Sequence, residues 1–150
     1  MTDEYLKQIG RVAVNFSSLE IYLTFSIWEL ISEDQDLGKA ITSGMSFNSL
    51  SNMFAAICKI KINGSKELNE CEEVTKRINE VNVRRNQIMH SNWLTDEGTS
   101  KVSRLKIKAD GYKGIKLTNE YISVEEIQKL ADEIKLLAKD VMELSIKYKK

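Results

Sequence analysis

Apolar residues recur every three to four positions over most of this chain, and that spacing predicts four long helices. They are expected over residues 3–32, 45–61, about 66–90, and from Ser123 to the end of the chain. Residues 32–44 (SEDQDLGKAITSG) break the helical pattern, and NGS at 63–65 indicates a turn. Ser123 together with Glu126 fits a capping box that would start the last helix.

The first predicted helix is apolar on more than one side. One stripe at helical spacing consists of Ile9, Val12, Phe16, Leu19, Leu23 and Leu30. Much of a second stripe is formed by Val14, Ile21, Phe25 and Trp28. A helix with apolar residues on more than one face is covered from more than one side. In a chain of 150 residues, we expect this helix to be buried against its own bundle and against a second subunit.

Between the third and the last long helix, the pattern becomes strand-like. Short apolar runs occur around Val102–Ile107 and Ile115–Leu117. The turn signal DEGTS precedes the first run, and ADGYKG separates the two. This segment, about residues 93–120, predicts a small β-hairpin or three short strands. We therefore expect a mainly α protein, an antiparallel four-helix bundle with a small β-hairpin insert, in a single domain over residues 1–150.

Composition narrows the class of protein. The chain is 42% hydrophobic and 29% charged, as in ordinary globular proteins. Its 22 basic and 22 acidic residues cancel, so any contact with nucleic acid must come from a local patch. Two cysteines without metal-like spacing and a single histidine argue against a metal site, and we expect no cofactor. The free thiols, the acidic N-terminus and the absence of a run of ~18 apolar residues indicate a cytoplasmic protein without membrane contact.

The third predicted helix carries an arginine where an apolar residue is expected. Its buried stripe is predicted to consist of Cys71, Val74, Ile78, Val81 and Ile88. Arg85 lies in the middle of that stripe, whereas Arg84 lies on the solvated face near Glu80. Because an isolated buried charge is costly, Arg85 needs a partner, a cleft or a second subunit. Glu20, within NFSSLE on the first helix, is a candidate ion-pair partner.

Beside this stripe runs a row of neutral polar residues, namely Asn79, Asn82, Asn86 and His90. Asparagine is a poor helix former, so a groove or an interface explains the row better than bulk water does. A purely structural role is the alternative, since Arg and His also suit the negative end of a helix, by about 0.3–1 kcal/mol. On an ideal helix, Arg85 and His90 lie ~140° apart. They converge only if the helix loosens near His90 or if the arginine side chain wraps across.

The segment RNQIMH, residues 85–90, resembles the Arg–polar–x3–His signature of the HEPN superfamily. These are small helical domains of prokaryotic defence, toxin–antitoxin and RNA-processing systems, in which the motif marks a metal-independent endoribonuclease. NFSSLE and HSNW are also similar to a group of bacterial HEPN-like proteins. The resemblance assigns the catalytic positions to Arg85, Asn86 and His90. It also implies a homodimer, formed through the motif-bearing helix and the first helix, that brings two motifs together across a cleft.

The chemistry of these three residues suits the implied reaction. Cleavage of RNA by its own 2′-hydroxyl needs a general base, for which histidine is the natural choice. It also needs a fixed cation near the phosphate, which Arg85 would supply. Asn86 could orient His90 or donate to a phosphate oxygen. The implied products carry a 2′,3′-cyclic phosphate and a 5′-hydroxyl.

A basic segment could guide RNA to this site. Residues 101–116 are rich in cations with one aromatic residue among them, a pattern that suits a surface tracking the RNA backbone with one stacked base. The candidate contacts are Lys101, Arg104, Lys106, Lys108, Tyr112 and Lys113. The alternative is that lysines on a small hairpin protect an edge strand from aggregation.

Three hypotheses for the function remain open. The first is a HEPN-type endoribonuclease, as a toxin or phage-defence effector, with RNA as substrate and an antitoxin or regulatory protein as a further partner. The second is a non-catalytic HEPN-like module that binds RNA, a nucleotide or a partner protein. The third is a helical structural or interaction protein in which Arg85 belongs to a buried ion pair.

Overall fold

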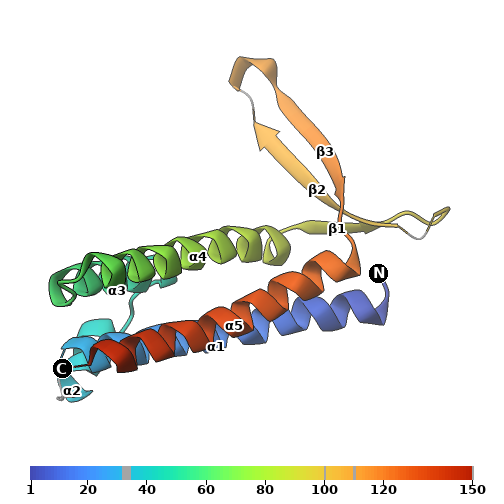
Figure 1. Cartoon of the computed structure of the whole chain (residues 1–150). Coiled ribbons are helices and arrows are strands. Elements are labelled where there is room, and N and C mark those ends of the chain that lie inside the picture. The colour runs from blue at the N-terminus through green and yellow to red at the C-terminus, as the bar shows by residue number, and fades with distance from the viewer. Residues whose placement is uncertain (32–34, 100, 110, 150) are drawn as a thin grey trace.

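The computed structural model describes residues 1–31, 35–99, 101–109 and 111–149, and shows a mainly helical chain with a small antiparallel sheet (Figure 1). Its helices are α1 (Asp3–Ile31), α2 (Gln35–Thr42), α3 (Phe47–Lys61), α4 (Ser65–Met89) and α5 (Val124–Tyr148). The predicted long helices are confirmed within a few residues at each end. The predicted break in helical structure at 32–44 is wrong for residues 35–42, because α2 occupies them. Residues 32–34 lie outside the described residues.

The helices α1 and α5 lie side by side and run in the same direction. Asn15 on α1 donates a hydrogen bond to the backbone oxygen of Ala131 (2.8 Å), and Ser26, three turns later, donates to that of Val141 (3.3 Å). Residue numbers therefore increase in the same direction along the two helices, which are parallel. The expectation of an all-antiparallel bundle is wrong for this pair.

The helix α4 runs in the opposite direction to α5. Arg77 pairs with Asp140 (2.7 Å) and Arg84 with Glu133 (2.5 Å), so residue numbers rise along one helix as they fall along the other. The small sheet lies between the end of α4 and the start of α5, at the end of the molecule that also holds the N-terminus (Figure 1). It thereby returns the chain to the start of α1, which explains why α1 and α5 are parallel.

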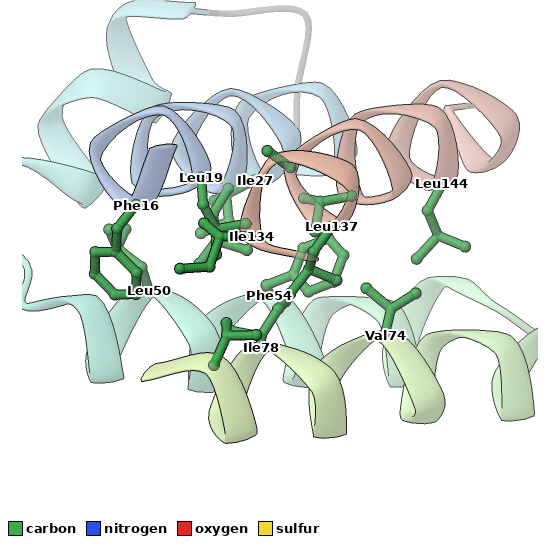
Figure 2. Packing of buried hydrophobic residues seen from close by; sticks show 14 of the residues in the cluster. Phe16, Leu19, Ile27, Leu50, Phe54, Val74, Ile78, Ile134, Leu137 and Leu144 are labelled. Atoms are coloured by element: carbon green, nitrogen blue, oxygen red, sulfur yellow. The ribbon is translucent and has the colours of Figure 1, made fainter. Parts of the chain in front are cut away.

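Apolar side chains from α1, α3, α4 and α5 form the core (Figure 2). The predicted stripe of α4 is buried in full, and so is the first stripe of α1 apart from half-buried Ile9. Phe54 on α3 is fully buried beside these stripes, and the Phe47 ring lies 4.3 Å from that of Phe16. The capping box of Ser123 and Glu126 is also confirmed at the start of α5.

The second stripe of α1 is different, because most of it faces outward. Val14, Ile21 and Phe25 are exposed in the single chain. Trp28, at the far end of the stripe, is half-buried, and its indole N–H donates to Thr42 on α2 (2.9 Å). The short helix α2 therefore covers one end of the stripe and leaves the rest open.

The described residues of the insert contain three strands, so of the two predicted arrangements the three-strand one is confirmed. The strands are β1 (Asn92–Thr95), β2 (Val102–Ala109) and β3 (Ile115–Tyr121), in the order β1-β2-β3, with a short 3₁₀ turn at Gly111–Lys113. Both pairings are antiparallel. The outer part of β2 and β3 stands away from the helices as an arm (Figure 1).

The base of the sheet is anchored on the helices. Val102 is buried there, and the indole of Trp93 donates to the backbone oxygen of Ile88 on α4 (3.3 Å). Within the described ranges, none of the helices combines the length and the apolar character that crossing a bilayer would require.

Candidate functional site

Arg85 interrupts the buried stripe of α4, as the sequence predicts, and its side chain is half-buried. The guanidinium carbon lies 4.6 Å from the centre of the Phe16 ring on α1, close enough for a cation–π contact. Its Nη1 donates to the side-chain oxygen of Asn86 (2.8 Å). Its Nε is buried and has no hydrogen-bond partner in the part of the chain that the structure describes. The arginine thus rests on an aromatic ring and a neutral amide.

Glu20 does not fill the role expected of it. The ion pairs among the described residues include none between Glu20 and Arg85, although Glu20 is itself half-buried. Phe16, one helical turn before Glu20, contacts the guanidinium instead. Within one chain, the buried ion pair of the third hypothesis is therefore absent from these residues.

The row of asparagines on α4 lies against α3. Asn82 donates to the side-chain oxygen of Asn48 (2.8 Å), and Asn86 donates to that of Asn82 (3.4 Å). Ser51 on α3 donates to the side chain of Asn79 (3.2 Å). Asn48, Asn82 and Asn86 form a continuous chain of hydrogen bonds, here called the amide row, that leads from α3 to Arg85. The predicted interface for these residues is thus partly the contact between α3 and α4.

His90 ends α4 and projects into solvent. Its backbone N–H donates to the Asn86 oxygen (3.0 Å), so the helix remains regular up to Met89. The imidazole is exposed and makes no hydrogen bond among the described residues. Neither of the two routes that could bring Arg85 to His90 is seen, since the helix does not loosen before His90 and the guanidinium lies on Phe16. Among the described residues, Asn86 is hydrogen-bonded to both, to Arg85 through its side chain and to His90 through its backbone.

Arg104 does not belong with the other predicted RNA contacts, because it is only 5% exposed. Its Nε donates to Glu120, its neighbour across the strands (2.5 Å), and its Nη2 donates to Gln87 on α4 (3.3 Å). It therefore joins the arm to the end of α4, and its prediction as an RNA contact is corrected. Lys106 also pairs with Glu120 (2.7 Å). The hydrogen bond from Lys106, and then that from Arg104, hold the pKa of Glu120 below its ordinary value.

The remaining predicted RNA contacts lie on the exposed surface of the arm. Lys108 is near the end of β2, and Lys113 and Tyr112 are in the 3₁₀ turn at its tip, with the tyrosine ring fully exposed. Lys101, at the base, lies with its Nζ 5.6 Å from the centre of the Tyr121 ring. With exposed Lys116 directly opposite Lys108, the outer part of the arm thus presents three lysines and an aromatic ring to solvent.

Two residues that contribute to the site, Phe16 and Asn48, were not predicted from the sequence as part of it. Phe16 was assigned to the core, and only its position within NFSSLE linked it to the motif. Asn48 carried no pattern of its own.

Among the described residues, no group of His, Cys, Asp and Glu side chains could hold a metal ion. Cys58 and Cys71 are buried, and burial raises the pKa of both thiols.

No family model, curated protein or solved structure matches this chain.

Proposed function

We propose that the chain is a metal-independent endoribonuclease of HEPN type, acting as a homodimer in the cytoplasm as a toxin or defence effector. Its four long helices would then form the HEPN-type bundle. The proposal rests on the incomplete hydrogen bonding of the Arg85 guanidinium. Asn86 is the one hydrogen-bond partner of its guanidinium among the described residues, and Nε lacks any. A phosphate oxygen is the strong, charged acceptor that such a group lacks.

The three motif residues would divide the work. Arg85 would stabilise the charge that develops on the phosphate, because its guanidinium is always charged and its orientation is held by Phe16 and Asn86. His90 would take the proton from the 2′-hydroxyl as general base, for which its exposed imidazole is accessible. Attack of that oxygen on the phosphorus expels the 5′-oxygen and leaves a 2′,3′-cyclic phosphate.

A dimer would supply what one chain lacks. Arg85 and His90 point to different sides of α4, so two motifs that face each other would place an arginine of one chain near a histidine of the other. The exposed stripe of Val14, Ile21 and Phe25 on α1 offers apolar surface for that contact. RNA would reach the cleft along the exposed cations of the arm, and an antitoxin or regulatory protein would restrain the activity.

The test uses the purified full chain with mixed tRNA and mRNA in EDTA, and chemical mapping of the cut ends. We expect cleavage that leaves cyclic phosphate ends, a loss of at least about a hundredfold in His90→Ala, and a similar loss in Arg85→Met. The matched control is Arg84→Met, which removes the neighbouring surface arginine and its pair with Glu133. Equal loss in both arginine variants, or full activity of His90→Ala, would contradict the assignment.

A second candidate is the non-catalytic module. It is favoured by the absence of a described contact between Arg85 and His90, and by the amide row, which engages α4 with α3. The same assay distinguishes it. Retention of RNA on the protein in a filter assay, with no product formed by wild type after prolonged incubation, would support binding without catalysis.

A further inference from the structure

The strand β3 is an open edge of the sheet. In the described part of the chain it pairs only with β2, on one side, along all seven of its residues. Its side chains are largely exposed, with Ile115 at 72% and Leu117 at 61%. It belongs to the arm that stands away from the helices (Figure 1). An exposed edge strand of this length is a template for pairing with another strand.

The backbone groups that face outward can be identified. The N–H of Ile122 donates to Val102, the residue opposite it on β2. Because N–H and C=O groups alternate in direction along an antiparallel strand, even-numbered residues of β3 turn theirs toward β2. The odd-numbered residues turn theirs to the open edge: Ile115, Leu117, Asn119 and Tyr121. These four residues offer a row of donors and acceptors without a strand to receive them.

We propose that this edge pairs with β3 of a second copy of the chain, antiparallel, about a two-fold axis at Thr118. In that register, Leu117 lies opposite the partner's Asn119, and Ile115 opposite the partner's Tyr121. All four outward-facing residues then meet outward-facing residues, and the strands overlap over their full length. The two sheets join into one continuous six-stranded sheet. An identical strand met in antiparallel orientation is self-complementary, as a two-fold interface requires.

Charge supports the same register. Lys116 comes to lie opposite the partner's Glu120, on the polar face of the sheet, and the symmetry creates this contact twice. The Glu120 carboxylate already pairs with Arg104 and Lys106 of its own chain, so Lys116 of the other copy would join that cluster. The apolar face gathers Ile115, Leu117 and Tyr121 from both copies. A lysine on an edge strand ordinarily discourages pairing, but here it meets an opposite charge directly across the strands, which is favourable.

Neighbouring registers are less favourable. A shift by one residue places the apolar face of one strand beside the charged face of the other and misdirects every backbone bond. A shift by two residues shortens the overlap and separates Lys116 from the partner's Glu120. The interface centred on Thr118 is small compared with stable dimers, which bury about 1,600 Å² in total. We therefore expect reversible, concentration-dependent association. The inference does not depend on the proposed ribonuclease activity.

Single cysteines test the register in the full-length protein. At the axis, Thr118 faces its own copy in a pair without direct hydrogen bonds, where Cα atoms lie about 4.5 Å apart and a disulfide can form. Thr118→Cys is the test variant. Lys116→Cys is the matched control, on the same strand and face, because the two copies of that position would be roughly 14 Å apart. The native thiols of Cys58 and Cys71 are buried and do not compete.

Under mild oxidation, we expect the covalent dimer of Thr118→Cys to exceed that of Lys116→Cys at least about fivefold, since only the first satisfies disulfide geometry. Equal yields would overturn the proposal. Sedimentation of the unmodified protein provides a second measurement, in which pairing through β3 appears as association beyond the dimer proposed through α1 and α4. Asn119→Pro removes one outward N–H and leaves the bonds to β2 intact, so it should weaken self-association at least about tenfold. Unchanged association of a variant with normal helical circular dichroism would also overturn the proposal.

Discussion

Replacing Arg85 by methionine tests how the arginine contributes to stability. Methionine retains the length of the apolar stem and still covers the Phe16 ring. The change removes the cation–π contact with that ring, about 0.5–2 kcal/mol, and the hydrogen bond to Asn86, about 1.5–3 kcal/mol. It also removes the buried Nε that lacks a partner, which costs about 1–3 kcal/mol in the native protein. Because these contributions oppose each other, we expect the free energy of unfolding to change by only about 1 kcal/mol.

Urea denaturation, followed by circular dichroism at constant protein concentration, measures this change. The reference variant is Ile78→Ala, two stripe positions away in the same helix and fully buried, for which a loss of about 2–5 kcal/mol is expected. A loss of more than about 3 kcal/mol in Arg85→Met would refute the reasoning. Such a loss is typical of a broken buried ion pair, and would mean that a carboxylate compensates the arginine.

Two further predictions concern the arm and the last helix. Lys106 and Arg104 lower the pKa of Glu120 in the folded protein. The ionised carboxylate therefore stabilises the fold at pH values above its unfolded pKa, near 4.5. This stabilisation is lost as the pH falls through the lower pKa of the folded state. Urea denaturation should therefore show Glu120→Gln to be less stable than wild type at pH 6, with a smaller difference at pH 3; an equal difference at both would contradict this. Ser123→Ala removes the capping box of α5 and should cost about 1 kcal/mol, or a few degrees of melting temperature, and an unchanged melting temperature would speak against that contribution.

Local patterns in the sequence determined where the four long helices begin and which stripe of each is buried, although they missed α2. The stripe from Cys71 to Ile88 was predicted residue by residue, because side chains three or four positions apart share a face of any helix. The capping box at Ser123 was visible for the same reason, since its two hydrogen bonds span three residues. Even the anomaly of Arg85 could be found this way, as a charge at an apolar position.

Only the tertiary structure decided what those faces meet. Periodicity shows that Arg85 points toward the core, but the ring that receives it belongs to Phe16, far away in the chain. Alternation along β2 could not distinguish buried Arg104 from exposed Lys108, because both lie on one face, and only the base of the arm rests on α4. The parallel course of α1 and α5 follows from the sheet that returns the chain. Such contacts depend on the path of the whole backbone, whereas a pattern of a few residues reports only on the neighbours that helix or strand geometry brings together.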